Sequence, residues 1–156
     1  SRICDVSPRL DDTLAIVALT QSIMHMLWRL RTRNQRWRIH DRFLVGENRW
    51  RAQRYGVSNG LIDFGKGTVE DFADLLEELI ELVREDAIEL GCWAEVQAVR
   101  RIVEDGTSAD RQRSVYATAV AGGASAKEAH REVVRSLITE FSTGLEAHRK
   151  AELVTG

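Results

Sequence analysis

Residues 12–30 read DTLAIVALTQSIMHMLWRL. The large apolar side chains of this stretch recur at spacings of three and four residues, the spacing that lines one face of an α-helix. The members of this face are Ile16, Leu19, Ile23, Leu27 and Leu30. We expect Asp11 or Asp12 to cap the start of the helix, and the polar run of residues 31–35 to end it. The sequence therefore predicts a long helix whose apolar face lies in a core.

Further elements are expected on both sides of this helix. Residues 2–6 are rich in β-compatible side chains and predict a short strand, which the following Ser-Pro pair ends. A second helix is predicted over about residues 39–55, with Gly56 as its C-terminal stop. A glycine-rich connection follows over residues 56–67, and residues 61–64 within it form a candidate extended piece.

Four more helices follow from capping signals, glycine stops and apolar periodicity. Their expected ranges are 68–91 with a break near 84–86, 93 to a stop at Gly106, Thr107 or Ser108 to about 120, and 125 through 141. Thr68 with Asp71 and Ser125 with Glu128 have the spacing of capping boxes. The sequence thus predicts a mainly α fold of about six helices and one short strand. We expect one domain over residues 1–143 and a loosely ordered tail over residues 144–156.

Composition limits the class of protein to which the chain can belong. Its 156 residues fit one domain, and 44% hydrophobic with 29% charged residues are typical of a globular protein. No apolar run approaches the ~20 residues that span a bilayer, so we expect no membrane partner. The start has no signal-peptide pattern, and the two cysteines, Cys4 and Cys92, do not suggest a disulfide framework. These features predict a cytoplasmic location.

Charge is distributed unevenly along the chain. Residues 29–54 contain nine arginines against Asp41 and Glu47, whereas residues 70–89 contain nine acidic residues against Arg84 alone. Two explanations are open: the two blocks attract each other, or the basic block binds an anionic ligand. A helical interaction or nucleic-acid-binding module using residues 29–54 is the alternative function that this pattern allows. The formal net charge of −2 argues against nucleic acid.

The segment with the most candidate binding groups is ENRWRAQRYG, residues 47–56. On a helix, Glu47, Arg51 and Arg54 lie at positions i, i+4 and i+7 and share a face. Taken alone, such a pattern is most often a solvated face, where a Glu–Arg pair contributes only tenths of a kcal/mol. The functional interpretation is that these arginines, with Asn48, position an anionic substrate through forked hydrogen bonds.

Three segments resemble a known family. Residues 47–56 match a Glu-Asn-x-Trp-x-Ala-x-Arg-Tyr-Gly signature, and residues 106–113, GTSADRQR, are similar to a Gly-Thr-x-Ala-Asp-Arg-Gln-Arg segment. The third match is residues 2–5, RICD, followed by Asp11-Asp12. In this order and spacing they resemble the carboxylate–amine ligases related to type-2 glutamate–cysteine ligases, from residue 1 to about residue 141.

The resemblance implies a fold and a chemistry. It implies that the chain is the C-terminal helical part of a glutamine-synthetase-like α+β fold. Enzymes of this kind use ATP and Mg²⁺ to convert a carboxylate into an acyl phosphate, which an amino-acid or amine substrate then attacks. Metal ions and arginines neutralise the charge of the transferred phosphoryl group.

The resemblance also implies roles for individual residues. Arg2 matches a catalytic, phosphate-binding arginine of the family strand. The residues expected to bind substrate or phosphate are Glu47, Asn48, Arg51, Arg54, Arg111 and Arg113. The metal-binding glutamate of that strand would lie two residues before Arg2, so no metal ligand is expected in this chain. We therefore expect the chain to be inactive alone. Its expected partner is the N-terminal portion of the same ligase or a second copy of the chain.

Overall fold

The computed structural model describes residues 7–155 and divides the chain into two compact units. One unit combines the described parts of residues 1–14 and 105–156, and the other is residues 15–104. The predicted strand at residues 2–6, and Arg2 within it, lie outside the described residues.

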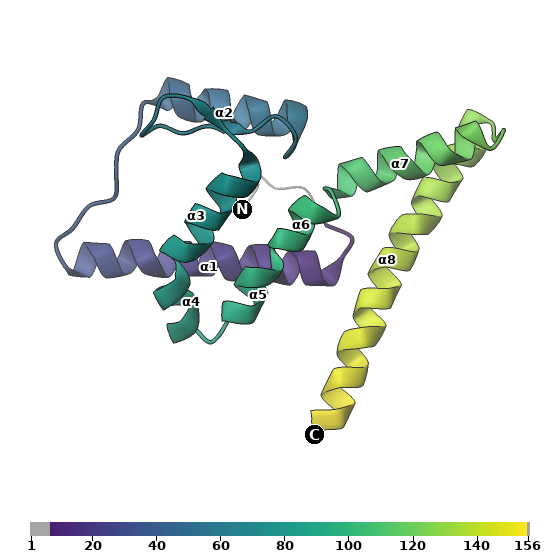
Figure 1. The fold of residues 1–156 in the computed structure, drawn as a ribbon. Helices are drawn as coiled ribbons and strands as arrows, with labels where there is room; N and C mark the ends of the chain where they lie inside the picture. Colours follow the sequence, from purple (N-terminus) through teal and green to yellow (C-terminus); the bar gives the residue numbers. More distant parts are fainter. Residues whose placement is uncertain (1–6, 156) are drawn as a thin grey trace. The chain divides into compact units, whose positions relative to one another are not determined.

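The elements confirm a mainly α chain (Figure 1). In order they are α1 (Leu10–Thr32), α2 (Arg42–Tyr55), β1 (Leu61–Ile62), β2 (Val69–Glu70), α3 (Phe72–Leu82), α4 (Arg84–Glu89), α5 (Trp93–Ala98), α6 (Arg100–Glu104), α7 (Ser108–Ala121) and α8 (Ala126–Thr155). The described residues contain eight helices where six were expected, because two of the predicted helices are each divided into two. The expected break near residues 84–86 lies at Val83, and the second, unexpected one lies at Val99.

The core of the 15–104 unit joins α1 to helices α3 to α6. Its buried members are Ala15, Ala18, Met26, Leu76, Ile80, Val83, Ala87, Val96 and Val99. The prediction for the buried face of α1 was partly wrong, since Ile16 and Leu27 are exposed while Leu19, Ile23 and Leu30 pack against the core. Small side chains at the contact allow a neighbouring helix to approach closely. Periodicity of large residues alone therefore misplaces the face.

A two-stranded hairpin covers part of the predicted glycine-rich connection. β1 and β2 are antiparallel, with Leu61 opposite Glu70 and Ile62 opposite Val69. Gly60 has a φ of +63°, and a Cβ there would collide with the Glu70 carbonyl oxygen, so glycine is required. The capping box predicted at Thr68 is wrong: its hydroxyl donates to the Glu70 carboxylate at 2.7 Å, and α3 begins only at Phe72.

Helices α7 and α8 form the larger part of the other unit. Both expected starts are confirmed: Thr107 and Asp110 form a capping box, and Ser125 exchanges hydrogen bonds with Glu128. By contrast, α1 begins at Leu10, so Asp11 and Asp12 lie in its first turn and neither precedes the helix as a cap.

Helix α8 continues beyond the point where the sequence predicts a tail. Its backbone is helical to Thr155, whereas the tail was expected from residue 144. None of the helices in the described part of the chain is long and apolar enough to cross a membrane.

Candidate functional site

The hairpin is attached to α2 by two of the predicted site residues. The Asn48 side chain accepts a hydrogen bond from the Ile62 amide at 2.7 Å and donates one to the Ile62 carbonyl at 2.9 Å. Arg51 donates to the carbonyl oxygens of Gly60 and Asn59, at 3.2 and 2.8 Å. Both side chains thus satisfy backbone groups of the hairpin, which makes them the structural connection between α2 and β1.

Glu47 and Arg54, which share a face of α2 with Arg51, do not bind the hairpin. They share with Trp50 the spacing i, i+3 and i+7, and therefore one helix face. Within the described residues neither Glu47 nor Arg54 makes a hydrogen bond or ion pair, and Trp50 and Arg54 are exposed. The predicted face is therefore divided: Arg51 turns to the hairpin, while Glu47 and Arg54 keep their polar groups available for a ligand.

Replacing Asn48 by alanine is expected to destabilise the 15–104 unit by about 1–3 kcal/mol, because two backbone groups of Ile62 lose their partners. Urea denaturation measures the change. Asn59→Ala is the matched control, since only the backbone oxygen of Asn59 is used. Equal losses for the two variants would contradict a structural role of the Asn48 side chain.

Arg111 lies at the centre of an ionic network in the other unit. Its guanidinium donates to Glu140 at 2.8 and 3.3 Å, to the Gly106 carbonyl oxygen at 2.7 Å and to Asp12 at 3.5 Å. Arg9 extends the network to Glu140 at 3.4 Å and to Asp105 at 2.8 Å. The arginine that the sequence assigns to substrate binding thus connects the start of α1 to α7 and α8.

Arg113, two residues further on, is in a different environment. Its side chain is 73% exposed, and among the described residues its one ion pair is with Asp110, one helical turn earlier, at 2.7 Å. The arrangement therefore leaves Arg113 accessible to a ligand, whereas Arg111 is engaged on several sides.

A buried carboxylate that the sequence does not single out holds α1 to α4. The Asp86 side chain is 0% exposed. It accepts from Nε and Nη2 of Arg29 at 2.9 and 2.7 Å, and from Nδ1 of His25 at 2.8 Å. The Arg29 guanidinium, followed by the His25 ring, holds the pKa of Asp86 below its ordinary value. Because the ionised Asp86 can only accept, the His25 ring carries a proton on Nδ1, and its Nε2 lies 3.9 Å from Glu89.

The attraction between the basic and acidic blocks, one of the two explanations left open by the charge pattern, is thus realised at this cluster. A charge block alone does not reveal which of its members is buried. The spacing of His25 and Arg29, four residues apart on one helix face, was the available signal.

Acid is expected to destabilise the protein through such carboxylates. The pKa of Asp86 lies below its ordinary 3.8, and that of Asp63 is lowered by two backbone N–H groups of its own turn. A group whose folded pKa is depressed stabilises the fold above its unfolded pKa, and this contribution disappears as the pH falls through the folded pKa. The free energy of unfolding should therefore fall below about pH 4. Urea titrations from pH 7 to pH 2 measure it, and a flat profile below pH 4 would contradict the expectation.

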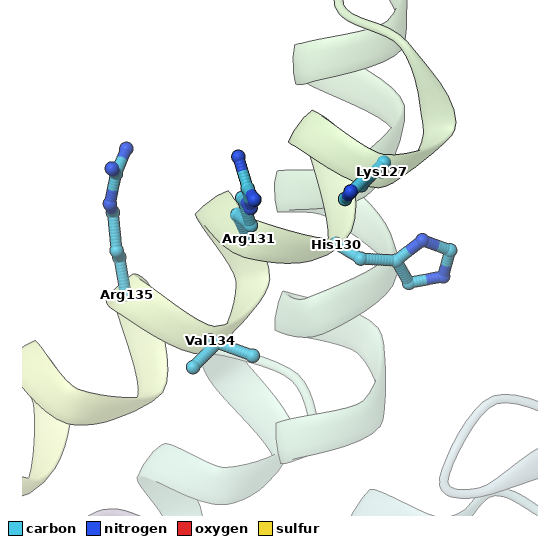
Figure 2. A pocket seen from close by; sticks show the side chains of 5 residues that line it. All are labelled: Lys127, His130, Arg131, Val134 and Arg135. Carbon is cyan, nitrogen blue, oxygen red and sulfur yellow. The ribbon is translucent and has the colours of Figure 1, made fainter.

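The N-terminal part of α8 carries a shallow basic depression (Figure 2). It is lined by Lys127, His130, Arg131, Val134 and Arg135. Figure 2 shows Arg131 and Arg135 extending from the same side of α8, with the His130 ring on another. No predicted site residue lines this depression. No set of three or more His, Cys, Asp or Glu side chains in the described residues is arranged to hold a metal ion.

The segments 47–56 and 106–113 both lie within the part of the chain that matches one sequence family. The sequence model of glutamate-cysteine ligase family 2 matches residues 1–140, which include every predicted site residue. The chain belongs to glutamate–cysteine ligase family 2.

Three relatives illustrate how far this family membership extends. A protein of Jannaschia sp. (strain CCS1) named "Putative glutamate--cysteine ligase 2" is 55% identical over 93% of this chain and 38% of its own length. Proteins of the same name from Ruegeria pomeroyi and Rhodospirillum rubrum are 52% and 54% identical over 93% and 89% of the chain, and 37% and 36% of their own lengths. The chain thus spans a little over a third of these relatives. No solved structure matches it.

Membership of glutamate–cysteine ligase family 2 covers both units. The matched residues include α1 to α7 and the first half of α8. The Arg2 position also falls within the match, although its structure lies outside the described residues.

Proposed function

We propose that this chain is part of an ATP-dependent carboxylate–amine ligase of the glutamate–cysteine ligase type. The observation that carries the proposal is the family match over residues 1–140. In the proposed reaction the carboxylate takes the γ-phosphoryl group of ATP and ADP leaves. The amine then attacks the acyl carbon, phosphate leaves, and an amide bond remains.

The contribution of the described residues would come from the open face of α2, which carries Glu47 and Arg54, and from Arg113 in α7. Arg54 and Arg113 are exposed and can pair with a phosphate or carboxylate, and Glu47 can accept from a substrate ammonium group. Asn48, Arg51 and Arg111 would act by holding the elements that carry these groups. Arg2 stays the predicted catalytic residue.

The chain is proposed to need a partner for this activity. The described residues present no metal-ligand cluster, and the chain covers only 38% of the Jannaschia relative. The Mg²⁺ ligands and most of the substrate site would therefore come from elsewhere. We propose that the N-terminal portion of the same ligase supplies them. A second copy of the chain is the other partner that the sequence allows.

The test compares two proteins: residues 1–156 alone, and a chimera in which the upstream part of the Jannaschia relative is joined ahead of Ser1. Amide formation and ADP release are measured with ATP, Mg²⁺, glutamate and a panel of amines. We expect turnover by the chimera and none by the chain alone. A correctly folded chimera without ATP-dependent ligation, or turnover by the chain alone, would overturn the proposal.

Variants of the chimera test the open face of α2. Glu47→Gln and Arg54→Ala should each lower kcat/KM by about tenfold to a hundredfold, the effect of losing one charge-assisted hydrogen bond. Arg49→Ala is the control, because Arg49 is exposed on another side of the same helix. A uniform loss in all three variants would show that the effect is not specific to this face.

A further inference from the structure

Helix α8 has a regular pattern of exposed side chains on one side. Helices α7 and α8 pack together, and Ala129 on the inner side of α8 is completely buried. On the other side, beginning at residue 127, exposed side chains recur at alternating spacings of four and three residues. They form the α8 outer face: Lys127, Arg131, Val134, Ile138, Phe141 and Leu145.

The α8 outer face changes from charged to apolar along the helix. Its first two members are cations, and its last four are apolar side chains that are 43–60% exposed. The apolar part extends over about 17 Å of helix, at 1.5 Å per residue. Alternating spacings of four and three residues are those by which one helix packs along another. A contiguous exposed apolar stripe with this spacing therefore indicates a contact with a second helix.

The two cations of this face lie where they do not stabilise α8. Lys127 is the second residue of the helix, and the positive end of the helix dipole disfavours a positive charge there. Arg131 follows it at i+4, where like charges repel each other. Within the described part of the chain, neither side chain makes a hydrogen bond or an ion pair. Because both cations oppose the local stability of the helix, their placement favours an anionic partner.

Charge complementarity distinguishes between the possible partners of this face. The acidic side chains that the structure describes on α8 are all engaged within their own unit: Glu128, Glu132 and Glu140. From these side chains, a second copy of α8 offers no free carboxylate to the two cations. A helix that lies on an anionic membrane has cations along its whole length, whereas the described cations of α8 are confined to residues 127–135. A partner helix with one acidic and one apolar segment complements both parts of the face.

We infer that the α8 outer face is the docking surface for an amphipathic helix of a separate protein. That helix has acidic side chains opposite Lys127 and Arg131, and apolar side chains opposite residues 134–145. The basic depression, of about 510 Å³, lies where the two parts of the face meet, because both cations and Val134 line it (Figure 2). The inference goes beyond amide ligation, since the face continues past residue 140, where the family match ends.

Two synthetic helical peptides test this surface. Both have leucines at the same alternating spacings of four and three residues, and they differ at one end, which carries glutamates in one peptide and lysines in the other. Fluorescence anisotropy of the labelled peptides measures their binding to residues 1–156. We expect the glutamate peptide to bind about tenfold more tightly, because opposite charges attract and like charges repel across the interface. Added salt should reduce this preference.

Variants assign the preference to the α8 outer face. Lys127→Ala combined with Arg131→Ala should abolish the preference for glutamate, and it should raise Tm of the unit containing α8 by about 1–3 °C, because cations leave the helix start. Ile138→Ser should weaken both peptides about tenfold, because an apolar contact is lost. Arg49→Ala is the control: it removes an exposed arginine of the other unit and should change neither the binding nor this Tm.

Several results would overturn the inference. Equal binding of the two peptides, or a lower Tm in the double variant, would show that the cations serve the fold and not a partner. Binding to vesicles of phosphatidylcholine and phosphatidylserine, with none to the glutamate peptide, would assign the face to a membrane. A dimer in sedimentation that Ile138→Glu dissociates would assign it to a second copy.

The chimera with the Jannaschia upstream part provides the last comparison. Loss of peptide binding in the chimera would show that the ligase itself covers the α8 outer face, and would overturn the inference. Retained binding with the same preference for glutamate supports the docking surface. Because this readout is peptide binding, it is independent of whether the chimera performs ligation, and failure of the proposed function would leave it unchanged.

Discussion

Replacing Asp86 by asparagine is expected to lower the free energy of unfolding of the 15–104 unit by about 3–5 kcal/mol. The asparagine keeps the size of the side chain but removes the charge that Arg29 and His25 share. The amide nitrogen of the asparagine is a hydrogen-bond donor, and it would face Arg29 or His25, which are donors themselves. Breaking a buried pair leaves an uncompensated charge, which costs far more than breaking an exposed one.

Glu77→Gln is the matched control for this prediction. Glu77 is also held by a bidentate arginine, with Arg100 at 2.6 and 2.7 Å, but its side chain is 53% exposed. An exposed pair contributes about 0–1 kcal/mol. Urea denaturation of both variants, read together with amide exchange in residues 15–104, measures the difference. Similar losses for Asp86→Asn and Glu77→Gln would show that burial does not determine the cost.

The sequence predicts the local structure of this chain well where the signal is local. Thr107 and Ser125 start helices because each is followed three residues later by an acid that returns its hydrogen bond. Gly56 ends α2 with a φ of +60°, which glycine adopts without strain. In each case the deciding partner lies within four residues, so the pattern alone contains the information.

The predictions that failed depend on distant partners. The rotation of α1 is set by Asp86, which lies 57 residues after Arg29. The three tryptophans Trp28, Trp37 and Trp50 are all exposed, although side chains of this size usually pack between helices. Burial of an individual residue depends on the neighbour that covers it. When that neighbour is far away in the sequence, or in another part of the protein, periodicity cannot identify it.

The candidate site shows the same difference between features set by local partners and features set by distant ones. Residues 47–55 were correctly predicted as helical, but the sequence does not tell which of their polar side chains hold the fold and which are available to a ligand. Asn48 and Arg51 bind backbone groups of the loop that follows, at separations of 8–14 residues. A signature shared with a family does not separate residues that hold the fold from residues that contact ligand. The hydrogen bonds of the structure make that separation.

Arg111 and Arg113 differ in the same way, one holding the fold and the other exposed. Arg111→Met should destabilise the unit formed by residues 1–14 and 105–156 by about 3 kcal/mol, because it leaves the buried Asp12 and part of Glu140 without a cation. Arg113→Met should cost less than about 0.5 kcal/mol, because its ion pair is exposed and local.

Amide hydrogen exchange on α7 and α8 is the appropriate measurement, since the two units need not unfold together. Loss of protection in Arg111→Met but not in Arg113→Met would establish that Arg111 connects the start of α1 to these helices. In a complete ligase, Arg113→Met should then change kcat/KM without changing stability. If Arg111→Met instead left exchange unchanged, the network around Arg111 would be dispensable for folding, and the role in substrate binding that the sequence predicts would regain its support.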